Sequence, residues 1–184
     1  MDISYQQQLL RFARQVLENE LNNSRHYFDK YDIEEFQQER GLFVTLEKNG
    51  NLRGCIGRLE ARNSIFQNII DLSKAAAFED HRFSKLTSNE LDQVQIEISL
   101  LGFPQELDGL TTYEKMSKIR PKKDGVIISS NGKRATFLPQ VWDSLPILED
   151  FISELCRKAG LSKDHWQSND LEISVYQVEH FQET

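Results

Sequence analysis

Apolar residues recur at steps of three and four over residues 4–22, which is the spacing of one buried face of a helix. The residues after this predicted helix, 23–40, are polar and contain isolated aromatics but no glycine or proline. We therefore expect an ordered connector over 23–40 rather than a flexible linker. The apolar face consists of Leu9, Phe12, Ala13, Val16, Leu17 and Leu21, and the aromatics of the connector are His26, Tyr27, Phe28, Tyr31 and Phe36.

Two β-hairpins are predicted by the same signal, an Asn-Gly dipeptide between two runs of strand-forming residues. A helix with an apolar face is predicted after each hairpin, and this repeated order indicates a duplicated hairpin–helix architecture. The two copies share no obvious residue pattern. The hairpins lie at 42–59 around Asn49-Gly50 and at 126–138 around Asn131-Gly132, and the hairpin–helix units at 42–78 and 126–160.

The ends of the two later helices also carry signals. Ser64 is placed to cap the first of them, and Gly160 is placed as the residue that follows the second. Residues 94–101 alternate as a strand with one mainly apolar and one mixed face, and 173–178 predict a closing strand. No composition change marks a domain boundary. The sequence therefore predicts an α+β fold, with antiparallel hairpins and helices packed to one side.

Composition and charge narrow the function classes. The chain has 184 residues, 39% of them hydrophobic, with 22 basic against 29 acidic side chains and a net charge of −7. This composition excludes a disordered protein and argues against non-specific nucleic-acid binding, which needs clustered cations. The longest unbroken apolar run, 75–78, is too short to cross a bilayer, and the N-terminus has no signal-peptide pattern. We expect a cytoplasmic protein without a membrane partner.

A local basic stretch lies at residues 115–123, with five positive charges in nine residues. Pro121 interrupts this stretch, so a solvated loop is the first interpretation. A patch that binds phosphate or an acidic partner is the alternative.

Residues 53–57 form the most unusual stretch, because two glycines stand inside a predicted strand. Gly54 and Gly57 indicate a β-bulge or a close approach of another backbone. Two-residue alternation places Arg53 and Cys55 on one face, where a guanidinium favours a nucleophilic thiolate. The alternative is a buried structural cysteine. We expect Arg53 to be partly buried and paired with a carboxylate.

Glu97 and Asp80 are the best candidates for the partner of Arg53. Asp80 belongs to residues 79–83, where acid, imidazole and guanidinium groups follow a helix end. His81 could act as a general base toward Cys55, oriented by Asp80 or by Glu97. The alternative is a salt-bridged turn closed by Asp80 and Arg82.

Other chemical motifs are absent from the sequence. The two cysteines cannot build a disulfide framework, and neither they nor the four histidines show metal-ligand spacing. The glycine-rich nucleotide loops and the Gly-x-Ser-x-Gly motif are also missing. We therefore predict no metal and no cofactor.

Several longer motifs, in order along residues 5–181, resemble the signature of the AMMECR domain family. Bacterial and archaeal members of this family are called the A component of the AmmeMemoRadiSam system. The motifs are Gly41-Leu42-Phe43-Val44-Thr45-Leu46, Gly50-Asn51-Leu52-Arg53-Gly54-Cys55-Ile56-Gly57, Ala75-Ala76-Ala77-Phe78 with Asp80-His81-Arg82-Phe83, Ile96-Glu97-Ile98-Ser99-Leu100-Leu101, Asp124-Gly125-Val126-Ile127-Ile128, Phe137-Leu138-Pro139-Gln140-Val141-Trp142 and Lys158-Ala159-Gly160-Leu161.

The resemblance implies one domain over residues 1–184, with two intertwined lobes, no clear linker and a groove between the lobes. Many members have proline at the position of His81, so a catalytic role of this imidazole cannot be a family property. Cys55 is the candidate catalytic residue. The binding candidates, carried over by position, are Arg53, Gly54, Gly57, Asp80, Arg82, Glu97, Ser99, Pro139 and Gln140.

The resemblance also implies partners, namely a Memo-like protein and a radical SAM protein of one modification system. The leading hypothesis is a component that holds a small-molecule or nucleotide-like substrate, with Arg53 and Cys55 at the polar centre. The second hypothesis is a non-catalytic binding or scaffold module that docks on these partners. Whether the chain is an enzyme is left open, because no complete set of nucleophile, base and orienting group is visible.

Overall fold

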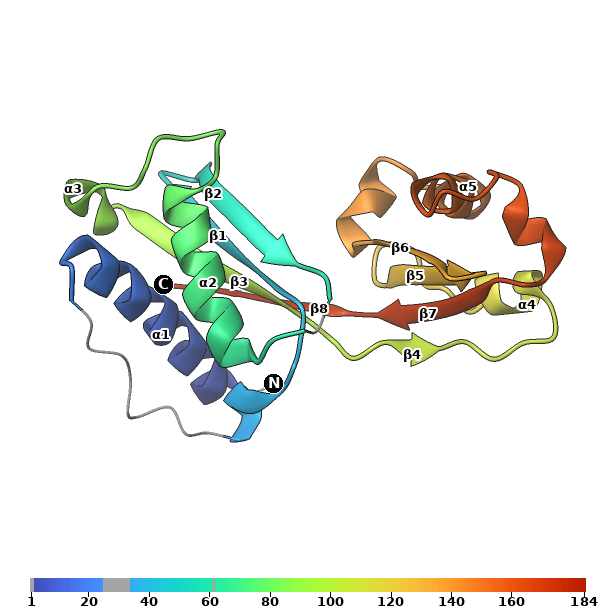
Figure 1. Ribbon diagram of the computed structural model, residues 1–184, viewed down its shortest axis with the longest axis horizontal. Coiled ribbons are helices and arrows are strands. Elements are labelled where there is room, and N and C mark those ends of the chain that lie inside the picture. The colour runs from blue at the N-terminus through green and yellow to red at the C-terminus, as the bar shows by residue number, and fades with distance from the viewer. Residues whose placement is uncertain (1, 25–33, 61) are drawn as a thin grey trace. The chain divides into compact units, whose positions relative to one another are not determined.

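The computed structural model describes residues 2–24, 34–60 and 62–184, which form two compact units (Figure 1). The first unit consists of the residues up to Leu101 together with Glu179–Thr184, and the second of Gly102–Val178. Each unit has its own sheet and its own hydrophobic core. The chain therefore leaves the first unit after Leu101 and returns to it at Glu179, where it adds a last strand to the sheet.

The first unit contains a four-stranded sheet in the order β2-β1-β3-β8. Strands β1 and β2 form the first predicted hairpin, and the positive φ angles of Asn49 (53°) and Gly50 (72°) confirm the predicted turn. Strand β3 pairs with β1 in antiparallel orientation. The strands are β1 (Leu42–Lys48), β2 (Asn51–Arg58), β3 (Val94–Leu101) and β8 (Val178–Gln182).

Helices α1 (Ile3–Leu21) and α2 (Ile65–Phe78) pack on one face of this sheet. The side chain of Ser64 accepts a hydrogen bond from the backbone N–H of Gln67, which confirms the predicted cap. The core on this face is built from alternate strand residues such as Val44 and Ile98, which are fully buried. The remaining alternate residues point to the other face of the sheet, against which neither α1 nor α2 packs.

We call this other side the open face of the first sheet. Most of its residues are polar, and they range from buried (Ser99) to exposed (His180), in contrast to the apolar core side. The residues that define it are Phe43, Thr45, Cys55, Gly57, Glu97, Ser99 and His180.

The second unit contains a four-stranded sheet in the order β4-β7-β5-β6. Its hairpin turns at Asn131 and Gly132, with φ angles of 51° and 76°, and Gly160 (φ 74°) follows helix α5, so both predictions are confirmed. The elements are β4 (Gln105–Glu106), α4 (Thr112–Met116), β5 (Gly125–Ser130), β6 (Lys133–Phe137), a 3-10 helix (Pro139–Asp143), α5 (Leu148–Lys158), a 3-10 helix (His165–Ser168) and β7 (Glu172–Tyr176).

The predicted α+β class is confirmed, because both sheets pair their hairpins in antiparallel orientation and are covered by helices. Two local predictions need correction. The closing strand was expected over 173–178, but two strands occur there, and β8 returns to the first sheet. The basic stretch 115–123 is only partly a solvated loop, because Met116 and Ile119 are buried in the second core.

The cations of the basic stretch are largely engaged within the second unit. Lys115 and Lys118 donate to the backbone carbonyls of Leu171 and Asp108, at 3.0 and 2.6 Å. Arg120 pairs with the buried Asp124 at 2.7 Å. This arrangement favours a structural role for these three cations over a free phosphate-binding patch.

The connector 23–40 is described only in part. Glu34–Gln37 forms a 3-10 helix whose Phe36 is fully buried in the first core, which agrees with an ordered connector. Residues 25–33, with His26, Tyr27, Phe28 and Tyr31, lie outside the described residues. Helix α3 (Ser88–Leu91) was not predicted. Among the described helices, none has the length and apolar character needed to cross a membrane.

Candidate functional site

The signature strand β2 contains a β-bulge at Arg53. Leu46 pairs with Gly54 and the next residue, Glu47, pairs with Leu52, so Arg53 is the extra residue. Gly54 lies directly against helix α2, because a Cβ atom at this position would be 2.1 Å from the carbonyl oxygen of Ala76. Both predictions for the glycine-rich stretch, a bulge and a close backbone approach, are therefore confirmed.

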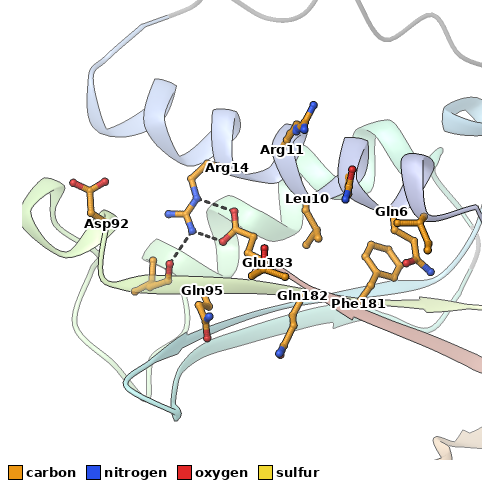
Figure 2. Close-up of a pocket in the computed structure, with 13 residues that line it drawn as sticks. Gln6, Leu10, Arg11, Arg14, Asp92, Gln95, Phe181, Gln182 and Glu183 are labelled. Carbon is orange, nitrogen blue, oxygen red and sulfur yellow. Dashed lines mark hydrogen bonds and ion pairs between the residues drawn. The ribbon is translucent and has the colours of Figure 1, made fainter.

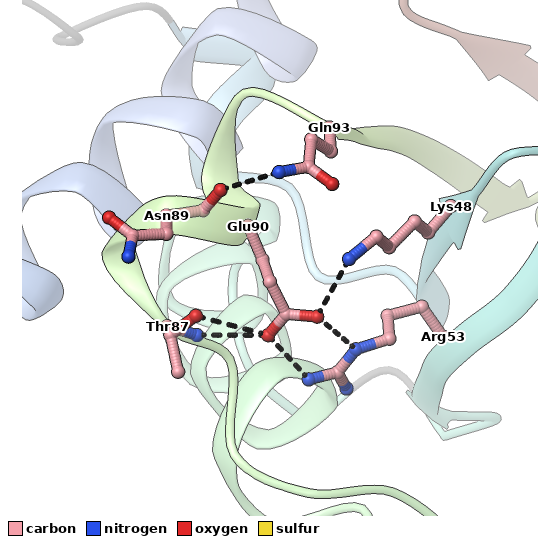
Figure 3. A network of polar contacts seen from close by, with 6 residues as sticks. All are labelled: Lys48, Arg53, Thr87, Asn89, Glu90 and Gln93. Atoms are coloured by element: carbon pink, nitrogen blue, oxygen red, sulfur yellow. Dashed lines mark hydrogen bonds and ion pairs between the residues drawn. The ribbon is translucent and has the colours of Figure 1, made fainter.

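Arg53 is buried and ion-paired, as predicted, but with a different partner. Its side chain is 10% exposed and its Nη2 atom lies 3.2 Å from Oε2 of Glu90 (Figure 3). The predicted partners Asp80 and Glu97 were wrong. The extra residue of the bulge breaks the two-residue alternation, so Arg53 does not share the face of Cys55 and extends instead toward the start of helix α3.

Glu90 is the centre of a small polar network in the first unit. Its carboxylate accepts hydrogen bonds from Arg53 and from Lys48 (Nζ to Oε1, 3.1 Å), and also from the backbone N–H of Thr87 (3.3 Å) (Figure 3). The hydrogen bonds from Arg53 and Lys48 lower the pKa of Glu90 to about 2. The Nη1 atom of Arg53 is buried and has no hydrogen-bond partner among the residues that the structure describes. This network ties the bulge to helix α3.

Asp80 and Arg82 contact the backbone of Cys55 at the outer edge of β2. The backbone N–H of Cys55 donates to Oδ2 of Asp80 at 2.9 Å, and Nη2 of Arg82 donates to the carbonyl oxygen of Cys55 at 3.2 Å. Arg82 also binds both carboxylate oxygens of Asp80, at 2.9 and 2.7 Å. Because β2 is the last strand of its sheet, this ion pair occupies the place of a neighbouring strand.

The environment of Asp80 stabilises its charged form. Its side chain is buried, and the hydrogen bonds from Arg82 and from the backbone N–H of Cys55 hold the pKa of Asp80 well below its usual range. The Arg82 side chain is 57% exposed. The buried carboxylate therefore holds one end of a guanidinium whose other end reaches solvent.

His81 does not take the role suggested for a general base. It is exposed, and in the part of the chain that the structure describes no hydrogen bond or ion pair joins it to Cys55 or to Asp80. Both oxygens of Asp80 are occupied by Arg82 and by the backbone of Cys55. The geometry of residues 79–83 is thus that of the salt-bridged turn.

The Cys55 thiol lies on the open face beside Thr45. The Thr45 hydroxyl donates to Sγ of Cys55 at 3.3 Å, and Thr45 pairs in register with Cys55 on one side and with Glu97 on the other. Cys55, Thr45 and Glu97 therefore form a row across three adjacent strands. Among the described residues, no imidazole or carboxylate side chain bonds to the thiol.

A second polar group on the open face joins Ser99, Glu97 and His180. The Ser99 hydroxyl lies 2.9 Å from Nδ1 of His180 and 3.3 Å from Oε1 of Glu97, and His180 Nδ1 is 3.8 Å from that same carboxylate oxygen. The imidazole beside the predicted site is therefore His180 rather than His81. Sequence reasoning missed His180 because strand β8 was not predicted; its alternation with the buried Phe181 was the available signal.

A steric contact on the open face also explains why residue 57 is a glycine. A Cβ atom at this position would lie 2.1 Å from Cδ1 and 2.2 Å from Cγ of Phe43, which is its partner in the β1–β2 pair. The Phe43 ring therefore occupies the space above Gly57. Any side chain at residue 57 would displace this ring.

A groove of about 670 Å³ lies in the first unit between helix α1 and the end of β8 (Figure 2). None of the predicted site residues lines it. At its wall, Arg14 pairs with Glu183 and donates to the carbonyl of Val94 at 2.7 Å (Figure 2). Arg14 also donates to the carbonyl of Leu91 at 2.7 Å. These contacts tie α1 to the sheet, so the charged groups Arg14 and Glu183 are already used by the fold.

The two remaining candidates, Pro139 and Gln140, belong to the second unit. They begin the 3-10 helix Pro139–Asp143, whose Trp142 is fully buried and donates from Nε1 to the carbonyl of Asp124 at 2.8 Å. Gln140 is exposed. Within residues 2–24, 34–60 and 62–184, no group of three or more His, Cys, Asp or Glu side chains could hold a metal ion.

Comparison with known proteins identifies the family. The family model described as AMMECR1 matches residues 10–181. The chain belongs to the AMMECR1 family. A protein of Methanothermobacter thermautotrophicus is 35% identical to it over 181 residues, which cover 95% of this chain and 92% of the relative. A protein of Thermofilum pendens is 36% identical and covers 96% and 88%, respectively.

A solved structure shows the same fold as this AMMECR1-family chain. The crystal structure of an uncharacterized protein from Pyrococcus horikoshii matches it with a TM-score of 0.71 and 30% sequence identity. The match covers 95% of this chain and 89% of that protein. The fold described above is therefore shared with a family member of known structure.

The structure explains much of the AMMECR1 signature in terms of packing. Gly54 allows the approach of α2, Gly57 leaves room for the Phe43 ring, and the backbone of Cys55 is bound by the Asp80–Arg82 pair. The side chains of Cys55 and Glu97 on the open face take no part in these packing contacts.

Proposed function

We propose that this protein is the ligand-holding component of a cytoplasmic modification system, in which a Memo-like protein and a radical SAM protein are its partners. The resemblance of residues 5–181 to the AMMECR signature supports these partners. The open face of the first sheet is where we place the small polar or nucleotide-like ligand. Its polar side chains support this placement, because they hydrogen-bond mainly to one another.

The arrangement around Cys55 is the observation that carries the proposal. The thiol accepts a hydrogen bond from the Thr45 hydroxyl, and no described side chain is placed to remove its proton. Nucleophilic catalysis by a cysteine needs such a base or a cationic group at the thiol. The Arg82 guanidinium is bonded to the Cys55 carbonyl, but it is already ion-paired with Asp80. Glu97 and Ser99 nearby supply an acceptor and a hydroxyl instead. This set suits the binding of a ligand better than a covalent step on this chain.

A docking module is the second candidate, and one observation favours it. The Arg82 guanidinium is held by a buried carboxylate but is 57% exposed, so its position is fixed while it faces solvent. A fixed exposed cation can pair with an acidic group on a partner protein, and such pairs mainly raise the rate and specificity of association.

Reconstitution of the three-protein system separates these functions. For ligand holding, we expect Glu97→Gln to lower turnover at limiting substrate while the affinity for both partners is unchanged. We expect Cys55→Ser to keep turnover within a few-fold, because serine retains an acceptor for the Thr45 hydroxyl. Loss of all turnover in Cys55→Ser with an unchanged melting temperature would instead assign Cys55 a nucleophilic role.

The docking alternative predicts a different variant to be decisive. Arg82→Gln should then weaken partner binding and make it less sensitive to salt, while Glu97→Gln should have no effect on turnover. Arg157→Gln is the control, because Arg157 is similarly exposed (64%) but its partner Glu154 on α5 is itself 43% exposed, so that guanidinium is not held by a buried carboxylate. Partner affinity can be measured by surface plasmon resonance or by titration calorimetry.

A further inference from the structure

We propose that the free edge of strand β8 binds an extended peptide segment of a partner protein, which carries an apolar and an acidic side chain. This segment adds a fifth strand to the first sheet, and its side chains enter the groove of about 670 Å³ beside helix α1 (Figure 2). The inference is independent of the ligand proposed for the open face. It follows from the unequal edges of the sheet, the lining of the groove and the charges at the groove.

The two edges of the first sheet differ. At the β2 edge, the Asp80–Arg82 pair binds the backbone of Cys55 and occupies the place of a neighbouring strand. At the opposite edge, no strand among the described residues pairs with the outer side of β8. The backbone groups of such an edge can pair with a strand from another chain.

The pairing of β8 with β3 determines which backbone groups face outward. The N–H of Glu183 donates to the carbonyl of Ile96 at 3.0 Å, so Glu183 directs its backbone groups toward β3. Phe181, two residues earlier, does the same. The alternate residues His180 and Gln182 therefore direct their N–H and carbonyl groups to the free edge. An added strand would pair with these two residues.

The groove beside this edge has an apolar lining. It includes the buried side chains of Leu10 and Phe181 and the exposed side chain of Ile3, the first residue of α1. The Phe181 side chain points toward α1 (Figure 2). Because side chains two residues apart in a strand share a face, every second side chain of an added strand would also point toward α1. An apolar side chain at such a position would lie beside Phe181.

The charges of the groove favour an acidic residue in the same segment. The charged residues that line it are Arg11, Arg14, Asp92 and Glu183, of which Arg14 and Glu183 pair with each other. Arg11 is exposed and has no carboxylate partner in the described parts of the chain, and Asp92 lies at the end of the groove away from Phe181 (Figure 2). An acidic side chain can therefore pair with Arg11. The net charge of −7 elsewhere is screened over about 8 Å at physiological salt.

Titration calorimetry with defined peptides tests the proposal. The probes are the end-blocked peptides Thr-Leu-Thr-Glu-Thr and Thr-Glu-Thr-Leu-Thr, which place leucine and glutamate on one face and cover both strand directions. The control Thr-Leu-Glu-Thr-Thr has the same composition but places them on opposite faces. We expect one probe to bind at least about fivefold more tightly than the control. Equal affinities, or no detectable binding of either probe at millimolar concentration, would overturn the proposal.

Two substitutions at Gln182 separate strand pairing from a folding defect. Gln182→Pro removes an outward N–H that the pairing with β3 does not use, so an edge strand tolerates it. We expect at least about fivefold weaker binding of the probe with an unchanged melting temperature. Gln182→Thr keeps the N–H and should retain the wild-type affinity. If the proline variant is less stable, single N-methylations along the probe make the same test, and unchanged affinity at every position would contradict strand addition.

A charge variant tests the recognition of the acidic residue. Replacement of glutamate by glutamine in the probe should weaken its binding to the wild type. Arg11→Gln should remove this difference, because the cation that pairs with the glutamate is lost. Arg134→Gln removes an exposed cation of β6 in the second unit and should leave the difference intact. A difference that persists in Arg11→Gln would show that Arg11 does not select the peptide.

Hydrogen exchange and oligomeric state identify the edge and its occupant. The amides of His180 and Gln182 should exchange more slowly in the complex, whereas that of Phe181, already directed toward β3, should change little. Protection confined to other strands would place the peptide elsewhere and overturn the proposal. A second copy of this chain is the competing occupant. We expect a monomer in sedimentation equilibrium, and a dimer that Gln182→Pro dissociates would assign the edge to self-association instead.

Discussion

The carboxylate of Asp80 accepts a hydrogen bond of 2.9 Å from the backbone N–H of Cys55 and thereby covers the outer edge of strand β2 at this residue. The pairing is completed by Arg82, which donates to the carbonyl of the same residue. An uncovered edge strand exposes a row of unpaired backbone groups and invites pairing with other chains. Cys55 is therefore held at its backbone by Asp80 and Arg82, while its side chain lies on the open face.

Replacement of Asp80 is the direct test of this edge cover. We expect Asp80→Asn to lower the free energy of unfolding by about 1–2 kcal/mol, because a charge-assisted hydrogen bond is lost while the side-chain size is kept. Urea denaturation near neutral pH measures the change. Equal stability of the variant and the wild type would mean that the contact contributes nothing to the fold.

The same contact predicts a dependence of stability on pH. The folded state holds the pKa of Asp80 below its usual range, so the unfolded state binds the proton more readily. The stabilisation from Asp80 is complete above about pH 5 and is lost as the pH falls toward and below the lowered pKa. The difference between the wild type and Asp80→Asn should therefore shrink from pH 6 to pH 3.

The Arg53–Glu90 ion pair should contribute more to the free energy of unfolding than an exposed ion pair does. Glu90→Ala leaves the guanidinium of Arg53 without its carboxylate while the Arg53 side chain is only 10% exposed. We expect a loss of about 2–3 kcal/mol in the free energy of unfolding, measured by urea denaturation. Glu154→Ala, which removes the exposed partner of Arg157, should cost less than about 0.5 kcal/mol. Similar losses in the two variants would contradict this difference.

Gly54 and Gly132 are predicted to differ sharply on replacement by alanine. At Gly54 the new Cβ would lie 2.1 Å from a backbone oxygen of α2, so the helix would have to shift; we expect a loss of more than about 3 kcal/mol. At Gly132 nothing lies within 4 Å, and only the positive φ of 76° is unfavourable, at about 1 kcal/mol. Denaturant midpoints of both variants test this order.

The two cysteines should react at different rates with a thiol reagent. Cys156 is fully buried in the second core, and burial raises the pKa of its thiol, as expected for a packing residue. Cys55 is partly exposed on the open face. We expect Cys55 to be labelled in the native protein and Cys156 only after unfolding. Labelling of Cys55→Ala at the wild-type rate would reverse this assignment.

Local signals in the sequence predict the parts of the fold that local physics determines. The Asn49-Gly50 and Asn131-Gly132 turns and the Ser64 cap need only their immediate neighbours, and all three are found in the structure. The glycines of β2 indicated an unusual strand, because a glycine inside a strand normally weakens that strand. These features depend on backbone conformations that few other residues adopt.

The polar partners were harder to predict, because they depend on register and on distant segments. One extra residue at Arg53 changed the direction of its side chain, so its partner is Glu90 instead of the predicted Glu97 or Asp80. His180 reached the open face only because β8 lies beside β3, more than seventy residues away in sequence. Neither a bulge position nor a long-range strand pair is visible in a two-residue alternation.

The return of the chain through β8 has a consequence for the order of folding. Residues 102–178 form a continuous unit, so this stretch can collapse as soon as it leaves the ribosome. The sheet of the first unit must wait, because its fourth strand follows that whole stretch. Until β8 is made, the edge of β3 has no strand partner, and we expect closure of this long loop to be the slow, non-local step that completes the first sheet.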